Sequence, residues 1–148
     1  MELFKSLAVA AVAAITVSPV LARNTPYFLD WSDVMALPEM QGRLGSVQFM
    51  FGEKTMPADA ERVTADVVVN NISKGERRDD DVVACQRAAQ AALTELAKRA
   101  RDAEANAVVN IVSFYKMNAY TSAKQYECHA GGTGGHLTFK ADLVKLRK

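Results

Sequence analysis

Two cysteines, Cys85 and Cys128, carry the most specific chemistry in this sequence. An even pair of cysteines in an exported protein is most often a structural disulfide. A redox-active pair usually has the close C-x-x-C spacing and an environment that favours the thiolate. These two lie about 43 positions apart, and for such a loop the chain-entropy model gives about 4 kcal/mol of stabilisation. We therefore predict a structural disulfide, with a redox-active pair as the alternative.

Two histidines flank a glycine run: His129 precedes residues 131–135 and His136 follows them. Together with Glu127 they offer two imidazoles and a carboxylate, a ligand set that suits zinc or copper. The competing interpretation is a solvent-facing hairpin whose polar side chains hold no metal. A glycine run that cradles a phosphate is followed by a helix, and here a strand is expected. The run therefore predicts a mobile hairpin loop.

No arrangement typical of a catalytic centre stands out in the sequence. There is no phosphate-binding P-loop motif, no Ser-His-Asp order and no close pair of carboxylates, and Ser113 lies inside a predicted strand without a neighbouring base. We predict that the protein is not an enzyme and needs no cofactor, with a hydrolase that has an unrecognised site as the alternative. The net charge is +1, and such a balanced charge gives no footprint for nucleic acid or an anionic membrane.

The first 22 residues have the composition of a secretory signal peptide. Lys5 supplies a charged start, residues 7–17 are apolar, and residues 18–22 lead to small residues before a cleavage site. The apolar run is too short for a permanent membrane anchor. We predict cleavage after Ala22, a single domain over residues 23–148, no membrane anchor after cleavage, and a periplasmic or secreted location.

The elements that position these residues are strands around one helix. Strands are expected at residues 46–51, 62–70, 107–115, 125–130 and 136–146. Most alternate apolar and polar residues, which indicates one buried face. The segment 107–115 is apolar on both faces, as in an interior strand. Residues 32–37 predict a short helical turn that Pro38 ends.

One long amphipathic helix is strongly indicated. Its apolar residues form a single stripe at helical spacing, and they are Cys85, Ala88, Ala89, Ala92, Leu93, Leu96 and Ala100. The aspartates at 79–81 provide an N-cap, and the alanine-rich stripe suits close packing on a sheet. This order predicts an α+β fold with a mainly antiparallel sheet packed against one long helix. A Cys85–Cys128 bond would then join the helix to the sheet.

Five short motifs extend over nearly the whole predicted mature chain. They are Arg-x-Thr at 23–25, Val-x-Phe-x-Phe-Gly at 47–52, Ala-Cys-Gln at 84–86, Ala-Val-Val-Asn-Ile-Val-Ser at 107–113 and Glu-Cys-His-Ala-Gly at 127–131. With these motifs the sequence resembles the small exported proteins with a YbjQ-like or RcsF-like domain, a group often labelled excinuclease ATPase subunit. The resemblance implies a Gram-negative envelope protein with that fold and a disulfide cysteine at the helix start, and for YbjQ-like domains heavy-metal binding.

Two features depart from that family pattern. The sequence has two cysteines, neither directly after the signal segment, so neither the second disulfide of RcsF nor its lipid anchor is expected. Where the family usually has glycine at the helix end, this chain has Glu104 and Ala105. Asn106 is then the residue best suited to a left-handed helix cap.

Taken together, the residues predict an exported binding or structural module of the cell envelope, stapled by one disulfide. The alternative is a metal-binding module that uses His129 and His136. The partners we expect are an unidentified envelope protein or a second copy of the chain, and not nucleic acid. An open sheet edge invites pairing, so the contact is predicted at the first and last strands.

Overall fold

The computed structural model describes residues 11–14, 23–74 and 80–147. Ala22, most of the predicted signal segment and Asp79 lie outside the described residues, so signal cleavage stays a prediction. Within the described ranges, no helix combines the length and the apolar character needed to cross a bilayer.

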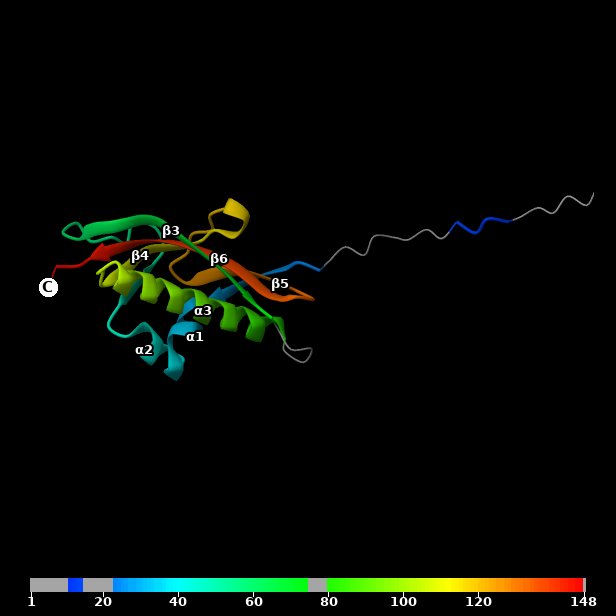
Figure 1. Ribbon diagram of the computed structural model, residues 1–148, viewed down its shortest axis with the longest axis horizontal. Coiled ribbons are helices and arrows are strands. Elements are labelled where there is room, and N and C mark those ends of the chain that lie inside the picture. The colour runs from blue at the N-terminus through cyan, green and yellow to red at the C-terminus, as the bar shows by residue number, and fades with distance from the viewer. Residues whose placement is uncertain (1–10, 15–22, 75–79, 148) are drawn as a thin grey trace, which may run out of the picture.

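Six strands form one curled sheet (Figure 1). They are β1 (Thr25–Asp30), β2 (Gln48–Phe51), β3 (Glu61–Ser73), β4 (Ala107–Ser113), β5 (Gln125–Gly131) and β6 (Gly134–Lys145). The strand order is β1-β5-β6-β4-β2, and β3 pairs with β6 outside this path. All pairs are antiparallel except β2 with β4, which is parallel. The predicted α+β class, with a mainly antiparallel sheet and one long helix, is confirmed.

The long helix α3 (Asp81–Asp102) lies along one face of the sheet, which we call the inner face (Figure 1). Every residue of the predicted apolar stripe is fully buried. The stripe packs in one core with the alternating residues Leu137, Phe139, Ala141 and Leu143 of β6. Asp80 caps the helix, since its Oδ1 accepts a hydrogen bond from the Val83 amide at 2.8 Å. The opposite face of the sheet is called the outer face.

The end of α3 uses a different left-handed residue from the one predicted. Glu104, not Asn106, has a φ of +59°. Its amide donates to the carbonyl of Arg101 at 3.0 Å, and the next amide donates to the carbonyl of Ala100 at 2.8 Å, which is the Schellman pattern. Asn106 instead joins the end of β6, because its side chain bonds both the amide and the carbonyl of Leu146, at 2.7 and 3.3 Å.

Two short helices, α1 (Trp31–Met35) and α2 (Pro38–Leu44), follow β1. The predicted helical turn is present as α1, which ends before Pro38, and Pro38 also begins α2, which the sequence did not predict. Proline suits a first helical position, where its missing amide has no partner to lose. Trp31 is buried and stacks on Phe51 with ring centroids 4.3 Å apart. This contact joins α1, which directly follows β1, to β2.

A short 3-10 helix, η1 (Tyr115–Met117), follows β4. It lies in the connection between β4 and β5, and it begins at Tyr115, where the sequence predicts the end of a strand. Its residues Lys116 and Met117 have φ values of +50° and +64°. The connection therefore bends sharply before the chain returns to the sheet as β5.

β6 is the central strand of the sheet, which corrects the expectation that the last strand offers a free edge. On one side it pairs first with β5 and then with β4, and on the other side it pairs with β3 along most of its length. Its apolar end is also covered, because Val144 and Leu146 pack with Met56 and Ala60 in a small outer cluster. Among the described strands, β1, β2 and β3 each pair with one neighbour.

Candidate functional site

The two cysteines form the predicted disulfide, which joins the first turn of α3 to β5. The Cα atoms of Cys85 and Cys128 are 5.9 Å apart, and both residues are fully buried. Because Cys85 belongs to the apolar stripe, the bond fixes the N-terminal end of α3 to the inner face. A redox-active pair needs at least partial exposure, so the burial favours a structural crosslink.

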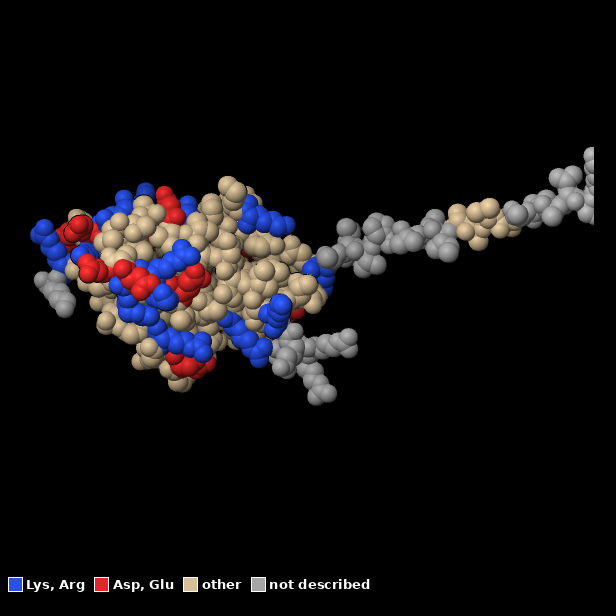
Figure 2. Space-filling model, viewed as in Figure 1, with Lys and Arg blue, Asp and Glu red and all other residues tan. Residues whose placement is uncertain are grey.

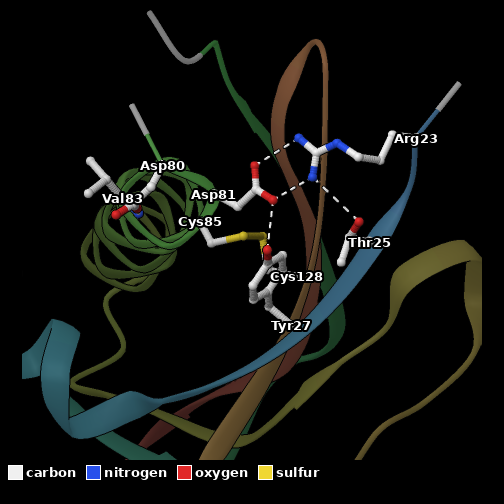
Figure 3. A network of polar contacts seen from close by, with 8 residues as sticks. All are labelled: Arg23, Thr25, Tyr27, Asp80, Asp81, Val83, Cys85 and Cys128. Carbon is white, nitrogen blue, oxygen red and sulfur yellow. Dashed lines mark hydrogen bonds and ion pairs between the residues drawn. A yellow bond between two sulfur atoms is a disulfide. The ribbon is translucent and has the colours of Figure 1, made fainter. Parts of the chain in front are cut away.

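A polar cluster beside the disulfide ties residue 23 to the start of α3 (Figure 3). The guanidinium of Arg23 donates two hydrogen bonds to the Asp81 carboxylate, at 2.5 and 3.0 Å, and the hydroxyl of Tyr27 donates a third at 2.7 Å. The bonds from Arg23 and Tyr27 hold the pKa of Asp81 at about 2, below its ordinary 3.8. Tyr27 is the register partner of Cys128. This N-terminal clamp and the disulfide therefore secure the same corner of the molecule.

His129 and His136 are register partners on β5 and β6, and both line a small cavity of about 90 Å³. Their ring nitrogens have separate partners. Nδ1 of His129 lies 3.0 Å from Oδ1 of Asn24, and the His129 ring stacks on Tyr115 with centroids 3.7 Å apart. Nε2 of His136 lies 2.8 Å from the hydroxyl of Thr133. The structure thus brings the two predicted ligands close together, but each imidazole contacts a different polar residue.

The predicted metal ligands are only partly assembled. Nε2 of His129 is buried without a hydrogen-bond partner and lies 3.4 Å from Oε1 of Glu127. The imidazole of His136 bonds Thr133 instead. Within the part of the chain that the structure describes, no three His, Cys, Asp or Glu side chains are grouped to hold a metal ion. A site that used both histidines would require His136 to leave Thr133.

The glycine run forms a two-residue turn between Gly131 and Gly134, which corrects the expectation of a five-residue loop. A Cβ on Gly131 would collide with the carbonyl oxygen of Arg23, and a Cβ on Gly135 would lie 2.8 Å from the backbone of Ala84 in α3. These glycines let the β5–β6 hairpin pack against α3 and the N-terminal clamp. Because β6 follows the turn, the helix that a phosphate cradle needs is not there.

A polar cavity of about 290 Å³ on the outer face has no counterpart in the sequence predictions. We call it the outer cavity, and its charged and amide-bearing lining residues are Glu53, Lys54, Asp66, Asn110, Lys140 and Asp142. They come from the loop after β2 and from β3, β4 and β6. The cavity thus collects polar side chains from four separate parts of the chain.

Two β-bulges, one on each side of β6, shape the outer cavity. On β3, Ala65 and Asp66 stand opposite the single residue Asp142. On β4, Asn110 and Ile111 stand opposite the single residue next to it, at position 141. Bulges redirect side chains and are over-represented beside active sites. The two bulges lie opposite neighbouring residues of β6, so they bend the sheet at the same place.

Asp142, which is 9% exposed, holds both bulges in place. Its Oδ1 accepts a hydrogen bond from the Asp66 amide at 2.8 Å, and its Oδ2 accepts one from Nδ2 of Asn110 at 3.0 Å. Arg62 approaches the same carboxylate at 3.4 Å. Asn110 is fixed a second time, because its Oδ1 accepts from the Thr55 amide at 2.8 Å. The floor of the outer cavity is therefore held by a network of hydrogen bonds.

Three non-glycine residues of the outer cavity have left-handed backbones: Lys54, Asp66 and Asn110, with φ of +54°, +53° and +54°. This conformation costs an ordinary residue about 1–2 kcal/mol, and less for Asp and Asn. The side chain of Asn110 has a structural role, because it forms hydrogen bonds with Thr55 and Asp142. The side chains of Asp66 and Lys54 make no hydrogen bond or ion pair with the described residues, so no internal contact accounts for them.

The lining of the outer cavity suits binding. It offers carboxylates and amines around small apolar surface from Val112, Ala119 and Ala141. The hydroxyl of Thr121 also belongs to the lining, and it donates a hydrogen bond to Oε1 of Glu53 at 3.0 Å. In the sequence, Asp66, Asn110 and Asp142 appear only as single polar residues between apolar neighbours, and that pattern does not bring them together.

Comparisons with known proteins assign no family to this chain. No family model matches the chain, no curated protein is significantly similar to it, and no solved structure matches it.

Proposed function

We propose that this protein is an exported, disulfide-stapled binding module of the cell envelope, and that the outer cavity is its ligand site. The observation that carries the proposal is the outer cavity itself, which two bulges and the Asp142 network build on the face opposite α3. The disulfide supports the location, since such bonds persist in oxidising compartments such as the periplasm.

Membership of the YbjQ-like or RcsF-like group is part of this proposal. Two of the motifs that carry the resemblance are structural elements of the core, because residues 107–113 are β4 and residues 127–131 belong to β5. The motif at 84–86 contains the disulfide cysteine in the first turn of α3. These positions support a shared fold, and we propose a Gram-negative periplasmic location on the same basis.

A role without catalysis and without nucleic acid is also part of the proposal. The alternative of a hydrolase stays open, because the carboxylates of Glu53, Asp66 and Asp142 also line the outer cavity. The visible face in Figure 2 shows acidic and basic side chains interspersed. On α3 these form pairs such as Lys98 with Asp102, at 2.7 Å. On this face, the interspersed charges give phosphate backbones no basic stripe to follow.

The proposal is tested in two steps on the full chain expressed in a Gram-negative host. First, mass spectrometry of the periplasmic fraction should find a protein whose mass corresponds to residues 23–148 with the disulfide formed. Second, the low-molecular-mass fraction of envelope extracts should shift the backbone amide signals of Asn110, Val112 and Lys140 in NMR spectra of the purified protein. A reduced protein confined to the cytoplasm, or extracts that leave these signals unmoved, would overturn the proposal.

Metal binding through His129 and His136 is a second candidate, favoured by one observation. The buried Nε2 of His129 has no hydrogen-bond partner and lies beside the Glu127 carboxylate, so a cation between them would satisfy both. Zinc and copper(II) titrations followed by calorimetry test this candidate. Binding that is lost in His129→Ala and weakened in His136→Ala supports it. No heat above buffer, or binding that survives in the double variant, contradicts it.

We also propose an association with an envelope protein or a second copy through an open sheet edge. The predicted edges were the last strand, which is the central β6, and the strand at residues 46–51, which corresponds to β2. The proposal therefore moves to the edge strand β1, which the sequence did not predict. This strand pairs only with β5 among the described residues, and its Phe28 is 45% exposed. Light scattering across a dilution series tests the contact between copies. A dimer mass that falls to the monomer mass in Phe28→Ser supports this contact. A monomer mass at every concentration contradicts it, and the proposed partner is then a different envelope protein.

A further inference from the structure

We propose that the outer cavity binds a small zwitterion, a molecule that carries both an ammonium and a carboxylate group, such as a free amino acid or a very short peptide. This inference rests on the proposed function and specifies the ligand class of the same site. It follows from three features of the outer cavity: its charges, its backbone conformations and its size.

The outer cavity presents unpaired charges of both signs. Asp66 and Lys54 are exposed at its rim, and neither forms an ion pair within the described ranges. The amine of Lys140 lies 4.5 Å from the centre of the Phe114 ring, and no carboxylate of the described residues pairs with it. A ligand with one charge would satisfy only one side of this lining. A zwitterion offers an ammonium to Asp66 and a carboxylate to the lysines, through charge-assisted hydrogen bonds.

The backbone at the rim is held in a conformation that favours glycine, yet charged side chains occupy it. Asp66 and Lys54 both have positive φ, so glycine would fit each position with less strain. Their side chains make no hydrogen bond or ion pair within the described residues, so both charged groups are available to a ligand. Strained residues of this kind cluster at ligand sites. We therefore assign their side chains to contacts with the ligand.

The size of the outer cavity limits the ligand. A volume of about 290 Å³ is at the lower end of the range for small-molecule sites, which excludes a folded partner from its interior. The apolar lining from Val112, Ala119 and Ala141 leaves room for a short aliphatic side chain. An amino acid of the size of alanine, or a dipeptide of two such residues, matches the volume and the charges together.

The test is an NMR titration of the oxidised full-length protein with alanine and alanyl-alanine. Two analogues serve as matched probes: N-acetylalanine lacks the ammonium, and alaninamide lacks the carboxylate. We expect both zwitterions to shift the amide signals of Asn110, Val112 and Lys140. Each analogue should bind about tenfold more weakly or worse, because it loses a charge-assisted hydrogen bond.

Two variants locate the charges, and a third controls for surface charge. Asp66→Asn keeps the size and the tolerance for positive φ but removes the partner of the ammonium. Lys54→Gln removes a partner of the carboxylate, and Glu39→Gln changes an exposed charge on α2. Zwitterion binding should weaken about tenfold in the first two variants and stay unchanged in the third.

Two results would overturn this inference. One is the absence of any response to millimolar alanine or alanyl-alanine. The other is equal binding of the zwitterions and their singly charged analogues. If envelope extracts still shift the same amide signals, the zwitterion inference fails while the proposed function stands. If the extracts have no effect either, the proposed function fails as well.

Discussion

The inner and outer faces of this sheet are built by opposite means. On the inner face, α3 lays an alanine-rich stripe against the apolar residues of the strands, and a buried disulfide fixes it there. On the outer face, bulges in β3 and β4 interrupt the ladder, three left-handed residues line a polar cavity, and the Asp142 carboxylate bonds two of them, Asp66 and Asn110. The inner face has the features of a stable scaffold, and the outer face carries the strain that often marks a site.

This difference between the two faces indicates which contacts stabilise the domain. A chain of this size has a modest core, so irregular backbone on one face needs a firm structure on the other. Here the crosslink, the Ala stripe and the Arg23–Asp81 clamp all act on the inner side or its corner. Changes on the inner face should therefore cost stability, whereas changes at the outer rim should affect ligand binding.

The largest expected effect is the loss of the disulfide. The double variant Cys85→Ala, Cys128→Ala should lower the free energy of unfolding by about 4 kcal/mol, because the unfolded chain regains the entropy of an open loop. Urea unfolding followed by the fluorescence of Trp31, the single tryptophan, measures this change. At low urea the amide signals of the outer cavity should keep their positions. A loss below about 1 kcal/mol would show that packing alone holds the inner face.

The second effect concerns the contact between the glycine turn and α3. Gly135→Ala places a Cβ 2.8 Å from the backbone of Ala84, so the strand and the helix must separate, at a cost of about 1–3 kcal/mol. Gly132→Ala is the matched control, since nothing lies within 4 Å of its added Cβ. It should change stability by less than about 0.5 kcal/mol. Equal effects in urea unfolding would show that the run acts as a flexible loop, as the sequence suggests.

The inner face could be predicted from the sequence because its signals are local and periodic. The stripe from Cys85 to Ala100, the aspartate cap and the alternation in β6 each depend on neighbouring residues. The disulfide followed from compartment and parity. Two inner features lay beyond that reasoning. Pairing of Arg23 with Asp81 joins residues 58 positions apart, and no spacing rule indicates it. The central place of β6 depends on which strands meet, which local patterns do not state.

The outer cavity could not be predicted because its residues come together only when the strands pair in the sheet. Asp66, Asn110 and Asp142 appear in the sequence as isolated polar residues in apolar strands. Their register across β6 turns them into one network. The left-handed backbones of Asp66 and Asn110 were missed for the same reason, since bulges follow from strand pairing. The histidines show the reverse case: their nearness was predicted, but the stacking on Tyr115 and the bond to Thr133 were not.

A smaller effect, of opposite sign, should follow at the outer rim. Asp66→Gly relieves a positive φ and should raise the free energy of unfolding by up to about 1 kcal/mol, while abolishing the response to alanine. Glu104→Gly relieves the same conformation at the end of α3 and should stabilise similarly without any change in binding. Thermal unfolding and the NMR titration measure both properties. A loss of stability in Asp66→Gly would show that the aspartate supports the fold, which would erase the contrast between the faces.

The smallest effect is the pH dependence of the N-terminal clamp. The pKa of Asp81 is about 2 in the folded protein against an ordinary 3.8, because Arg23 and Tyr27 donate hydrogen bonds to its carboxylate. A depressed acid pKa means that the unfolded chain binds the proton more readily. The contribution of the clamp is therefore complete above about pH 3.8 and is lost as the pH falls toward about 2. Thermal unfolding of the wild type and of Asp81→Asn should differ at pH 5 and converge near pH 2. Parallel curves over that interval would mean that Asp81 titrates normally and that Arg23 does not hold the corner beside the disulfide.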